Sequence, residues 1–143
     1  MNDARKLRIL VVDDDPAIVE LLSIVLEMAG YEVLTAGDGA QAVSLLQNLV
    51  PESLLDVIMV DLMMPVMDGL RFMRWLRTEF KSTVPVPVLA LTGRNKPGGE
   101  AMILQAGADA VLYKPVEPKE IVEMLATLLD RTGADGSVSP NIS

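Results

Sequence analysis

Five short aliphatic runs, each followed by a stretch with helical spacing, constrain the fold of this chain more than any other feature. The central run, Val57 to Val60, is apolar without alternation, which is the pattern of a strand covered on both faces. Strands and helices that alternate in this way form a parallel sheet with helices on both faces and right-handed crossovers. The sequence therefore predicts the α/β class, a (βα)5 doubly wound sheet of five parallel strands in the common order 2-1-3-4-5.

Local signals give the bounds of the predicted elements. Asp15 is the predicted N-cap of the first helix, Pro16 its first residue and Gly30 its stop. The strands are predicted at 7–12, 31–36, 57–60, 88–91 and 110–113, and the helices at 16–29, 42–49, 70–80, 100–106 and 118–128. The inward-facing residues predicted for three of the helices are Ile18, Leu21, Leu22, Val25 and Leu26; Phe72, Met73, Leu76 and Phe80; and Ile121, Val122, Met124, Leu125 and Leu128.

A chain of 143 residues suits one domain. We expect residues 1–6 to be an N-terminal extension and 7–131 to be the folded domain. Residues 132–143 are mostly Gly, Ser, Asp, Asn and Pro, which predicts a disordered tail or the stump of a linker. Residues 94–99 have little helical propensity and are expected to form a mobile loop.

The composition excludes several classes of function. The chain has no cysteine and no histidine, which excludes disulfides, thiolate catalysis and a phosphohistidine role. A formal net charge of −8 opposes binding to nucleic acid. No apolar run approaches the ~20 residues of a membrane span, and no targeting segment precedes the first strand. We therefore expect a cytoplasmic domain that contacts neither nucleic acid nor membrane.

Charged and polar residues stand at the predicted ends of four strands. Asp13 and Asp14 follow the first strand, Asp61 ends the third, Thr92 follows the fourth and Lys114 follows the fifth. Because parallel strands share one carboxyl edge, these side chains are expected to converge beside the first and third strands. Three carboxylates so close together repel one another, so one of them must keep its proton or the group must bind a cation. A site that offers only oxygen ligands, with no histidine or cysteine, favours Mg²⁺.

Such a pocket suits a phosphoryl group. Mg²⁺ and the Lys114 ammonium would offset charge on the phosphoryl oxygens, and a carboxylate is a competent nucleophile that becomes an acyl phosphate. The residues therefore predict that Asp61 is phosphorylated.

The same residues carry a family resemblance. The segments concerned are Asp13-Asp14, Asp61-Leu62-Met63-Met64-Pro65, Met67-Asp68-Gly69, Thr92-Gly93, Ala106-Gly107-Ala108-Asp109 and Lys114-Pro115. In this order, over about residues 6–131, they resemble the receiver domain of bacterial two-component response regulators. The resemblance implies a flavodoxin-like receiver fold and a phosphoacceptor function in two-component signal transduction.

The resemblance also implies the donor and the metal ligands. Asp61 is implied to take its phosphoryl group from the phosphohistidine of a sensor histidine kinase or a phosphotransfer protein. Asp14, Asp61 and the backbone carbonyl of Met63 are implied to bind Mg²⁺ directly, with Asp13 assisting through water.

Lys114 is implied to pair with the phosphoryl group and Thr92 to move inward and hydrogen-bond it. The Lys114–Pro115 peptide bond is implied to be cis. The movement of Thr92 would alter the face formed by the fourth helix, fifth strand and fifth helix, which binds a downstream output protein or domain. Whether two copies of the chain form a homodimer through that face stays an open question. The chain is then a signalling phosphoacceptor and not an enzyme, catalysing only its own phosphoryl transfer and slow dephosphorylation.

Two positions depart from the family pattern. Many receivers have Tyr or Phe three residues before the lysine, where this chain has Val111, and Phe after Lys-Pro, where it has Val116. Tyr113 lies on the same strand face as Val111 and is a candidate substitute. Met63, two residues after the predicted phosphoacceptor, cannot orient a hydrolytic water, which predicts slow self-dephosphorylation.

Two other functions stay open. The first is a receiver-like interaction module that acts without phosphorylation, and the intact set of Asp14, Asp61, Thr92 and Lys114 argues against it. The second is a Mg²⁺-dependent phosphohydrolase with an aspartyl nucleophile. Enzymes of this type in the haloacid dehalogenase family place a second acid two residues after the nucleophile, where this chain has Met63.

Overall fold

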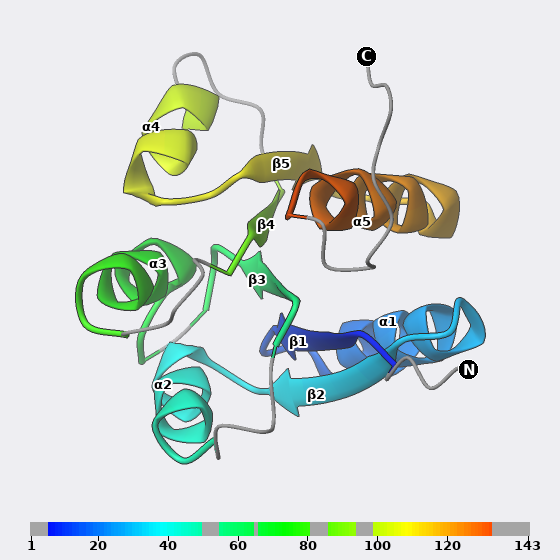
Figure 1. Ribbon diagram of the computed structural model, residues 1–143. Coiled ribbons are helices and arrows are strands. Elements are labelled where there is room, and N and C mark those ends of the chain that lie inside the picture. Colours follow the sequence, from blue (N-terminus) through cyan, green and yellow to red (C-terminus); the bar gives the residue numbers. More distant parts are fainter. Residues whose placement is uncertain (1–5, 50–54, 65, 81–85, 94–98, 133–143) are drawn as a thin grey trace.

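Five parallel strands form one sheet through the middle of the molecule (Figure 1). The computed structural model describes residues 6–49, 55–64, 66–80, 86–93 and 99–132. The strands are β1 (Arg8–Val12), β2 (Glu32–Ala36), β3 (Val57–Asp61), β4 (Val88–Thr92) and β5 (Ala110–Tyr113). They lie in the order β2-β1-β3-β4-β5, which confirms the predicted topology.

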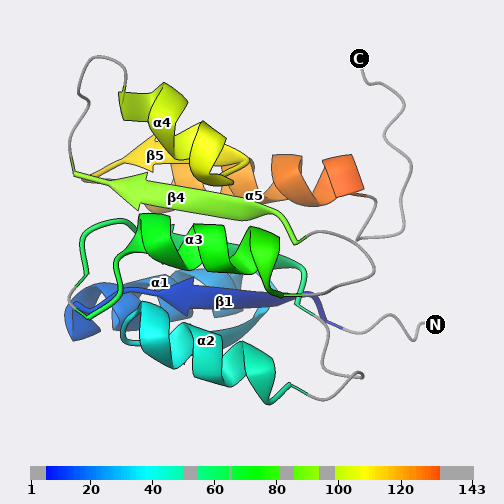
Figure 2. The ribbon, with the colours of Figure 1, turned by 90° about the vertical axis from the view of Figure 1, so that its left-hand side faces the viewer.

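Helices cover both faces of the sheet, as predicted. They are α1 (Pro16–Met28), α2 (Gly39–Gln47), α3 (Gly69–Thr78), α4 (Gly99–Ala106) and α5 (Pro118–Thr132). Helices α1 and α5 lie on one face and α2, α3 and α4 on the other (Figures 1 and 2). Every residue of β3 is buried, because both of its faces are covered. The sheet therefore separates two apolar clusters, one under each layer of helices.

Aspartates cap three of the helices, and one of them is Asp15, the N-cap that the sequence predicts. Asp15, Asp38 and Asp68 cap α1, α2 and α3, and each carboxylate accepts a hydrogen bond of 2.8–3.0 Å from a backbone N–H of the first turn. Gly30 follows α1 with φ +100°, a left-handed conformation that favours glycine. These local signals set where the helices begin and end.

The prediction for Leu21 is wrong. Leu21 is 50% exposed, because α1 contacts the sheet through Leu22 and Leu26, and neighbouring residues of a helix point about 100° apart. In the last helix the sequence analysis missed Leu129, which is buried beside Leu128.

Three predictions concern parts of the chain that the structure does not describe. The predicted N-terminal extension at residues 1–6 lies outside the described residues except for Lys6. The loop predicted at 94–99 lies outside the described residues except for Gly99, the first residue of α4. The predicted tail lies outside them from residue 133 onward. Across the described ranges, no helix is both long and apolar enough to cross a membrane.

Candidate functional site

Two acidic residues follow the end of β1. Asp13 is buried, with 2% of its surface exposed, and its Oδ1 accepts a hydrogen bond of 2.9 Å from the backbone N–H of Asp15. Asp14 is exposed. The local turn thus orients one carboxylate inward beside the sheet and leaves the next one at the rim.

Asp61 ends β3, the neighbour of β1 in the sheet. Because Val12 is in register with Val60, Asp13 and Asp61 both follow paired residues and lie at the same edge. Asp61 is 5% exposed, and its Oδ1 accepts a weak hydrogen bond of 3.3 Å from the backbone N–H of Met63. The two buried carboxylates therefore share one pocket.

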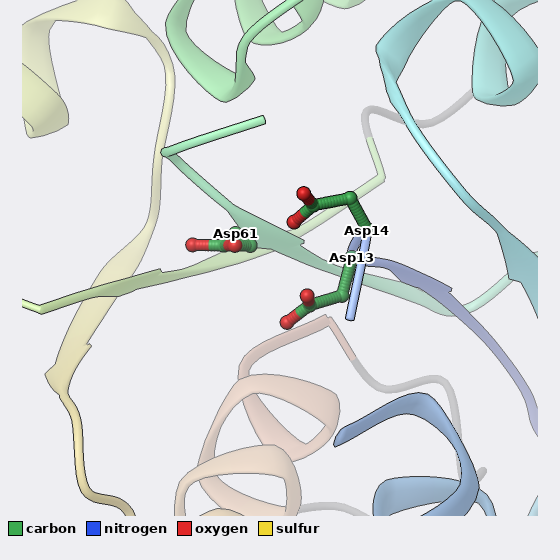
Figure 3. A group of neighbouring side chains, drawn as sticks. All are labelled: Asp13, Asp14 and Asp61. Carbon is green, nitrogen blue, oxygen red and sulfur yellow. The ribbon is translucent and has the colours of Figure 1, made fainter. Parts of the chain in front are cut away.

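The three carboxyl groups extend to the same side of the strand ends (Figure 3). One carboxylate oxygen each from Asp13, Asp14 and Asp61 lie within 4.8 Å of one another. Burial raises the pKa of Asp13 above its usual value, and the Asp61 carboxylate adds to this, while the Asp15 N–H and Lys114 act in the opposite direction. The group is therefore short of positive charge, and its all-oxygen donor set fits a hard divalent cation such as Mg²⁺.

Lys114 supplies the positive charge that the described residues bring into the pocket. Its Nζ lies 3.4 Å from Asp61 Oδ1 and 3.5 Å from Asp13 Oδ2. These distances are those of ion pairs and are long for hydrogen bonds. The backbone N–H of Lys114 donates to the Thr92 carbonyl at 2.8 Å, which ties the residue to β4. The Lys114–Pro115 peptide bond is cis, as the resemblance implies.

Thr92 ends β4 and is buried, with 8% of its surface exposed. It lies one residue beyond Leu91, the register partner of Asp61. Thr92 borders a cavity of about 570 Å³ between the segment that follows β3 and the first turns of α4. Met63 borders the same cavity with a side chain that is 76% exposed. The structure thus brings the predicted site residues to one edge of the sheet.

The flank of the site contains one contact that the sequence did not indicate. Val111 packs against the apolar cluster under α2, α3 and α4. The Tyr113 hydroxyl donates a hydrogen bond of 2.7 Å to Oε1 of Glu100, in the first turn of α4. The sequence analysis did not identify Glu100, because an acid in the first turn of a helix is ordinarily explained by the helix dipole.

The chain is similar to known proteins in both its sequence and its fold. Residues 9–126 match the family model of the response regulator receiver domain. The chain is 42% identical over 125 residues to the DNA-binding dual master transcriptional regulator RpaA of Synechocystis, and 38% identical over 129 residues to the DNA-binding response regulator MtrA of Mycolicibacterium smegmatis. These alignments cover 87% and 90% of this chain, and 50% and 53% of the respective relatives. The chain therefore spans about half the length of these relatives.

Solved structures of response regulators have the same fold as this chain. The receiver domain of the Francisella response regulator 1452 superimposes with a TM-score of 0.79 at 29% identity, covering 89% of this chain and 99% of that one. The chemotaxis response regulator CheY4 of Vibrio cholerae superimposes with a TM-score of 0.77 at 33% identity, covering 87% and 99%. Both similarities extend over nearly the whole described fold.

Proposed function

The chain belongs to the response regulator receiver family, and from that premise we propose that Asp61 is its phosphoacceptor. One observation carries the proposal. The Lys114 ammonium lies 3.4 Å from an oxygen of Asp61, inside a pocket where three carboxylates face one another. A buried acid beside a fixed ammonium is the arrangement that a phosphoryl acceptor requires, because negative charge increases when the phosphoryl group arrives.

The proposed reaction is a transfer between two side chains. A carboxylate oxygen of Asp61 forms a bond to phosphorus as the phosphorus–nitrogen bond of a phosphohistidine breaks. The donor imidazole leaves with the electron pair and takes up a proton. The product is an acyl phosphate on Asp61. The chain has no histidine, so the donor belongs to another domain or protein, for which we propose a sensor histidine kinase or a phosphotransfer protein.

Two residues act on the transferred group in this proposal. Lys114 pairs with a phosphoryl oxygen, which is supported by its position beside Asp61. Thr92 moves toward the phosphoryl group and donates a hydrogen bond to it. The end of β4, where Thr92 lies, is next to Asp61 in the register of the sheet.

The metal proposal concerns the acidic group. Asp14, Asp61 and the backbone carbonyl of Met63 would bind Mg²⁺ directly, and Asp13 would assist through water. Bound there, the ion offsets the charge of the carboxylates and of the phosphoryl oxygens. The support is the proximity of the three carboxylates and the raised pKa of Asp13.

Loss of the phosphoryl group is proposed to be slow. The side chain of Met63 is apolar and exposed, two residues after Asp61, so it offers no group that orients an attacking water. In this proposal the domain, with limits at 7–131, catalyses only its own phosphoryl transfer and this slow hydrolysis. We propose that it acts in the cytoplasm.

The output is proposed to pass through the face formed by α4, β5 and α5. Phosphorylation would change the packing of this face, and a downstream protein or domain would bind one of the two arrangements better. Some relatives are named as DNA-binding regulators, and this chain aligns with only about half of their length. A net charge of −8 supports placing any DNA contact outside this domain, and a homodimer through the face is a further candidate.

Incubation with acetyl phosphate and Mg²⁺ tests the proposal. We expect the intact protein to gain the mass of one phosphoryl group, and Asp61→Asn to gain none. The matched control is Asp38→Asn, which alters an aspartate at the N-cap of α2 and leaves the pocket intact, because asparagine caps helices equally well. A mass gain that persists in Asp61→Asn would show that another residue is the acceptor.

A further inference from the structure

The first turn of α4 is tied to β5 by one side-chain hydrogen bond. The Tyr113 hydroxyl donates to Oε1 of Glu100 at 2.7 Å. The bond lies at the surface, and ionisation of the phenol would break it and place two negative charges together. The pKa of Tyr113 is accordingly raised, and the hydrogen bond to Glu100 is the main cause. The titration of the Tyr113 phenol in solution therefore reports whether the bond is formed.

Tyr113 is also the strand neighbour of Thr92. The two residues are register partners in the β4–β5 ladder, so their side chains lie on the same face of the sheet. The next residue, Lys114, donates its backbone N–H to the Thr92 carbonyl at 2.8 Å. Only residues 93–98 separate Thr92 from Gly99, where α4 begins. Tyr113 thus lies beside Thr92 in the sheet, and Glu100 follows Thr92 by eight residues along the chain.

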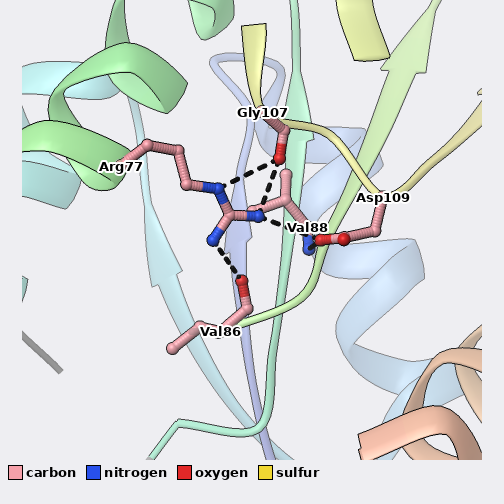
Figure 4. Close-up of polar contacts among 5 residues, drawn as sticks. All are labelled: Arg77, Val86, Val88, Gly107 and Asp109. Carbon is pink, nitrogen blue, oxygen red and sulfur yellow. Dashed lines mark hydrogen bonds and ion pairs between the residues drawn. The ribbon is translucent and has the colours of Figure 1, made fainter. Parts of the chain in front are cut away.

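The other end of α4 is held by several bonds (Figure 4). Arg77 of α3 donates to the Gly107 carbonyl from Nε at 3.1 Å and from Nη2 at 2.7 Å, and to the Val86 carbonyl from Nη1 at 2.8 Å. Its Nη2 also lies 2.9 Å from Oδ2 of Asp109, which accepts a further bond of 2.8 Å from the Val88 N–H. This end of the helix therefore resists displacement more than the first turn does.

Space for a movement of the first turn exists beside it. Gly99, Met102 and Ile103 of α4 border the cavity of about 570 Å³ that Thr92 also borders. Helix α4 thus has one end fixed by a guanidinium, a cavity next to its other end, and one hydrogen bond from β5 at that end.

We propose that the Tyr113–Glu100 hydrogen bond holds the first turn of α4 against β5 while Asp61 is unphosphorylated, and that phosphorylation breaks it. Tyr113 is then a positioning residue that acts through Glu100, and α4 turns about its end at Gly107. In this role Tyr113 takes the place of the aromatic residue that many receivers carry at the position of Val111. The inference rests on the proposed function, because the movement begins with Thr92 approaching a phosphoryl group on Asp61.

The first test follows the phenol directly. The chain has two tyrosines, so labelling their phenolic ring carbons with ¹³C gives two NMR signals, and Tyr113→Phe assigns them. In the unphosphorylated protein we expect a raised pKa for Tyr113 that returns to the ordinary value in Glu100→Ala. Glu120→Ala, which removes the acid from the first turn of α5, is the matched control and should leave the signal unchanged.

The same signal is then read at neutral pH with acetyl phosphate and Mg²⁺ in excess. We expect the Tyr113 signal to move to the position that it has in unphosphorylated Glu100→Ala, while the Tyr31 signal stays in place. A Tyr113 signal that does not move, in a sample that mass spectrometry shows to be fully phosphorylated, would overturn the inference and leave the proposed function intact. A sample that gains no phosphoryl mass would instead contradict the proposed function.

The second test measures linkage. If the bond favours the unphosphorylated arrangement, its removal must tighten binding of a phosphoryl mimic. We expect Tyr113→Phe to bind beryllofluoride, in the presence of Mg²⁺, about two- to tenfold more tightly by calorimetry, the range expected for the net contribution of one exposed hydrogen bond. Tyr31→Phe is the control and should bind as the wild type does. Equal affinity in Tyr113→Phe and wild type would overturn the inference.

Discussion

Replacing Gly69 by alanine tests how closely α3 must approach the strand that carries Asp61. A β-carbon at Gly69 would lie 2.7 Å from the Asp61 carbonyl oxygen and 2.8 Å from the Leu62 Cα. Both atoms belong to the backbone, so relief requires the end of β3 or the first turn of α3 to move. Overpacking of this kind costs about 1–3 kcal/mol, and the higher helix propensity of alanine returns at most about 1 kcal/mol. We therefore expect Gly69→Ala to lower the free energy of unfolding by about 1–2 kcal/mol.

The same displacement should slow phosphorylation. A shift of the Asp61 main chain moves its carboxylate relative to Lys114 and Asp13, and misplacement of a reacting group by a fraction of an ångström costs about tenfold or more in rate. Urea unfolding measures the first effect, and the rate of mass gain with acetyl phosphate measures the second.

Alanine substitutions at two other glycines separate the effect of a local displacement of Asp61 from the effect of lower stability. A β-carbon at Gly93 would meet nothing within 4 Å, so Gly93→Ala should change the free energy of unfolding by less than about 0.5 kcal/mol. A β-carbon at Gly30 also meets nothing, but its φ of +100° makes alanine unfavourable by about 1–2 kcal/mol. Gly30→Ala should therefore lose stability like Gly69→Ala and keep the wild-type rate of phosphorylation, because Gly30 lies beyond the far end of α1.

Either of two results would refute this reasoning. A free energy of unfolding for Gly69→Ala at or above the wild-type value would mean that the close approach is not required. A rate of phosphorylation reduced equally in Gly30→Ala would mean that lower stability, and not a local displacement, slows the reaction.

Three further predictions concern charge, hydrolysis and backbone strain. Burial raises the pKa of Asp13 above 3.8, its value in the unfolded chain. Between the unfolded and the folded pKa the folded chain holds a proton that the unfolded chain has lost, so the free energy of unfolding falls as the pH rises through this range. Asp13→Asn should therefore raise the free energy of unfolding at pH 7 in metal-free buffer and change it little at pH 3, both measured with urea; a lower value at pH 7 would contradict the assignment. Met63→Asn should shorten the lifetime of the phosphorylated form several-fold after acetyl phosphate is removed, followed by mass spectrometry, and an unchanged lifetime would exclude Met63 as the cause of slow hydrolysis. Val66 has φ +68°, which is unfavourable for a β-branched residue, so Val66→Gly should raise the free energy of unfolding by about 1 kcal/mol in the urea assay, and a decrease would count against strain at this position.

The sequence predicts the sheet well, because the relevant signals are local and repetitive. The absence of alternation in β3 predicts burial on both faces, and every residue of β3 is buried. The proximity of Asp13, Asp61 and Lys114 also follows from the sequence, since parallel strands bring their carboxyl ends to one edge. The ion pairs of Lys114 agree with this expectation.

Contacts made by long side chains are not predictable in the same way. Arg77 reaches the Gly107 carbonyl, which is 30 residues away in the sequence, and no periodic pattern marks such a bond. The bond between Tyr113 and Glu100 also lacks a periodic pattern, and the helix dipole is already a sufficient explanation for an acid at Glu100. The error at Leu21 has another cause, because spacing gives the apolar stripe of a helix but not which edge of the stripe faces the sheet.

The nearly equal distances from the Lys114 ammonium to Asp61 and Asp13, 3.4 and 3.5 Å, have a consequence for the cost of reorganisation. The Lys114 ammonium contacts two carboxylates. If it moves away from one of them toward an incoming phosphoryl oxygen, it still keeps the other as a counter-ion. In the proposed transfer to Asp61, few solvent molecules or side chains other than Thr92 would then need to rearrange as negative charge builds up, which would keep the barrier low.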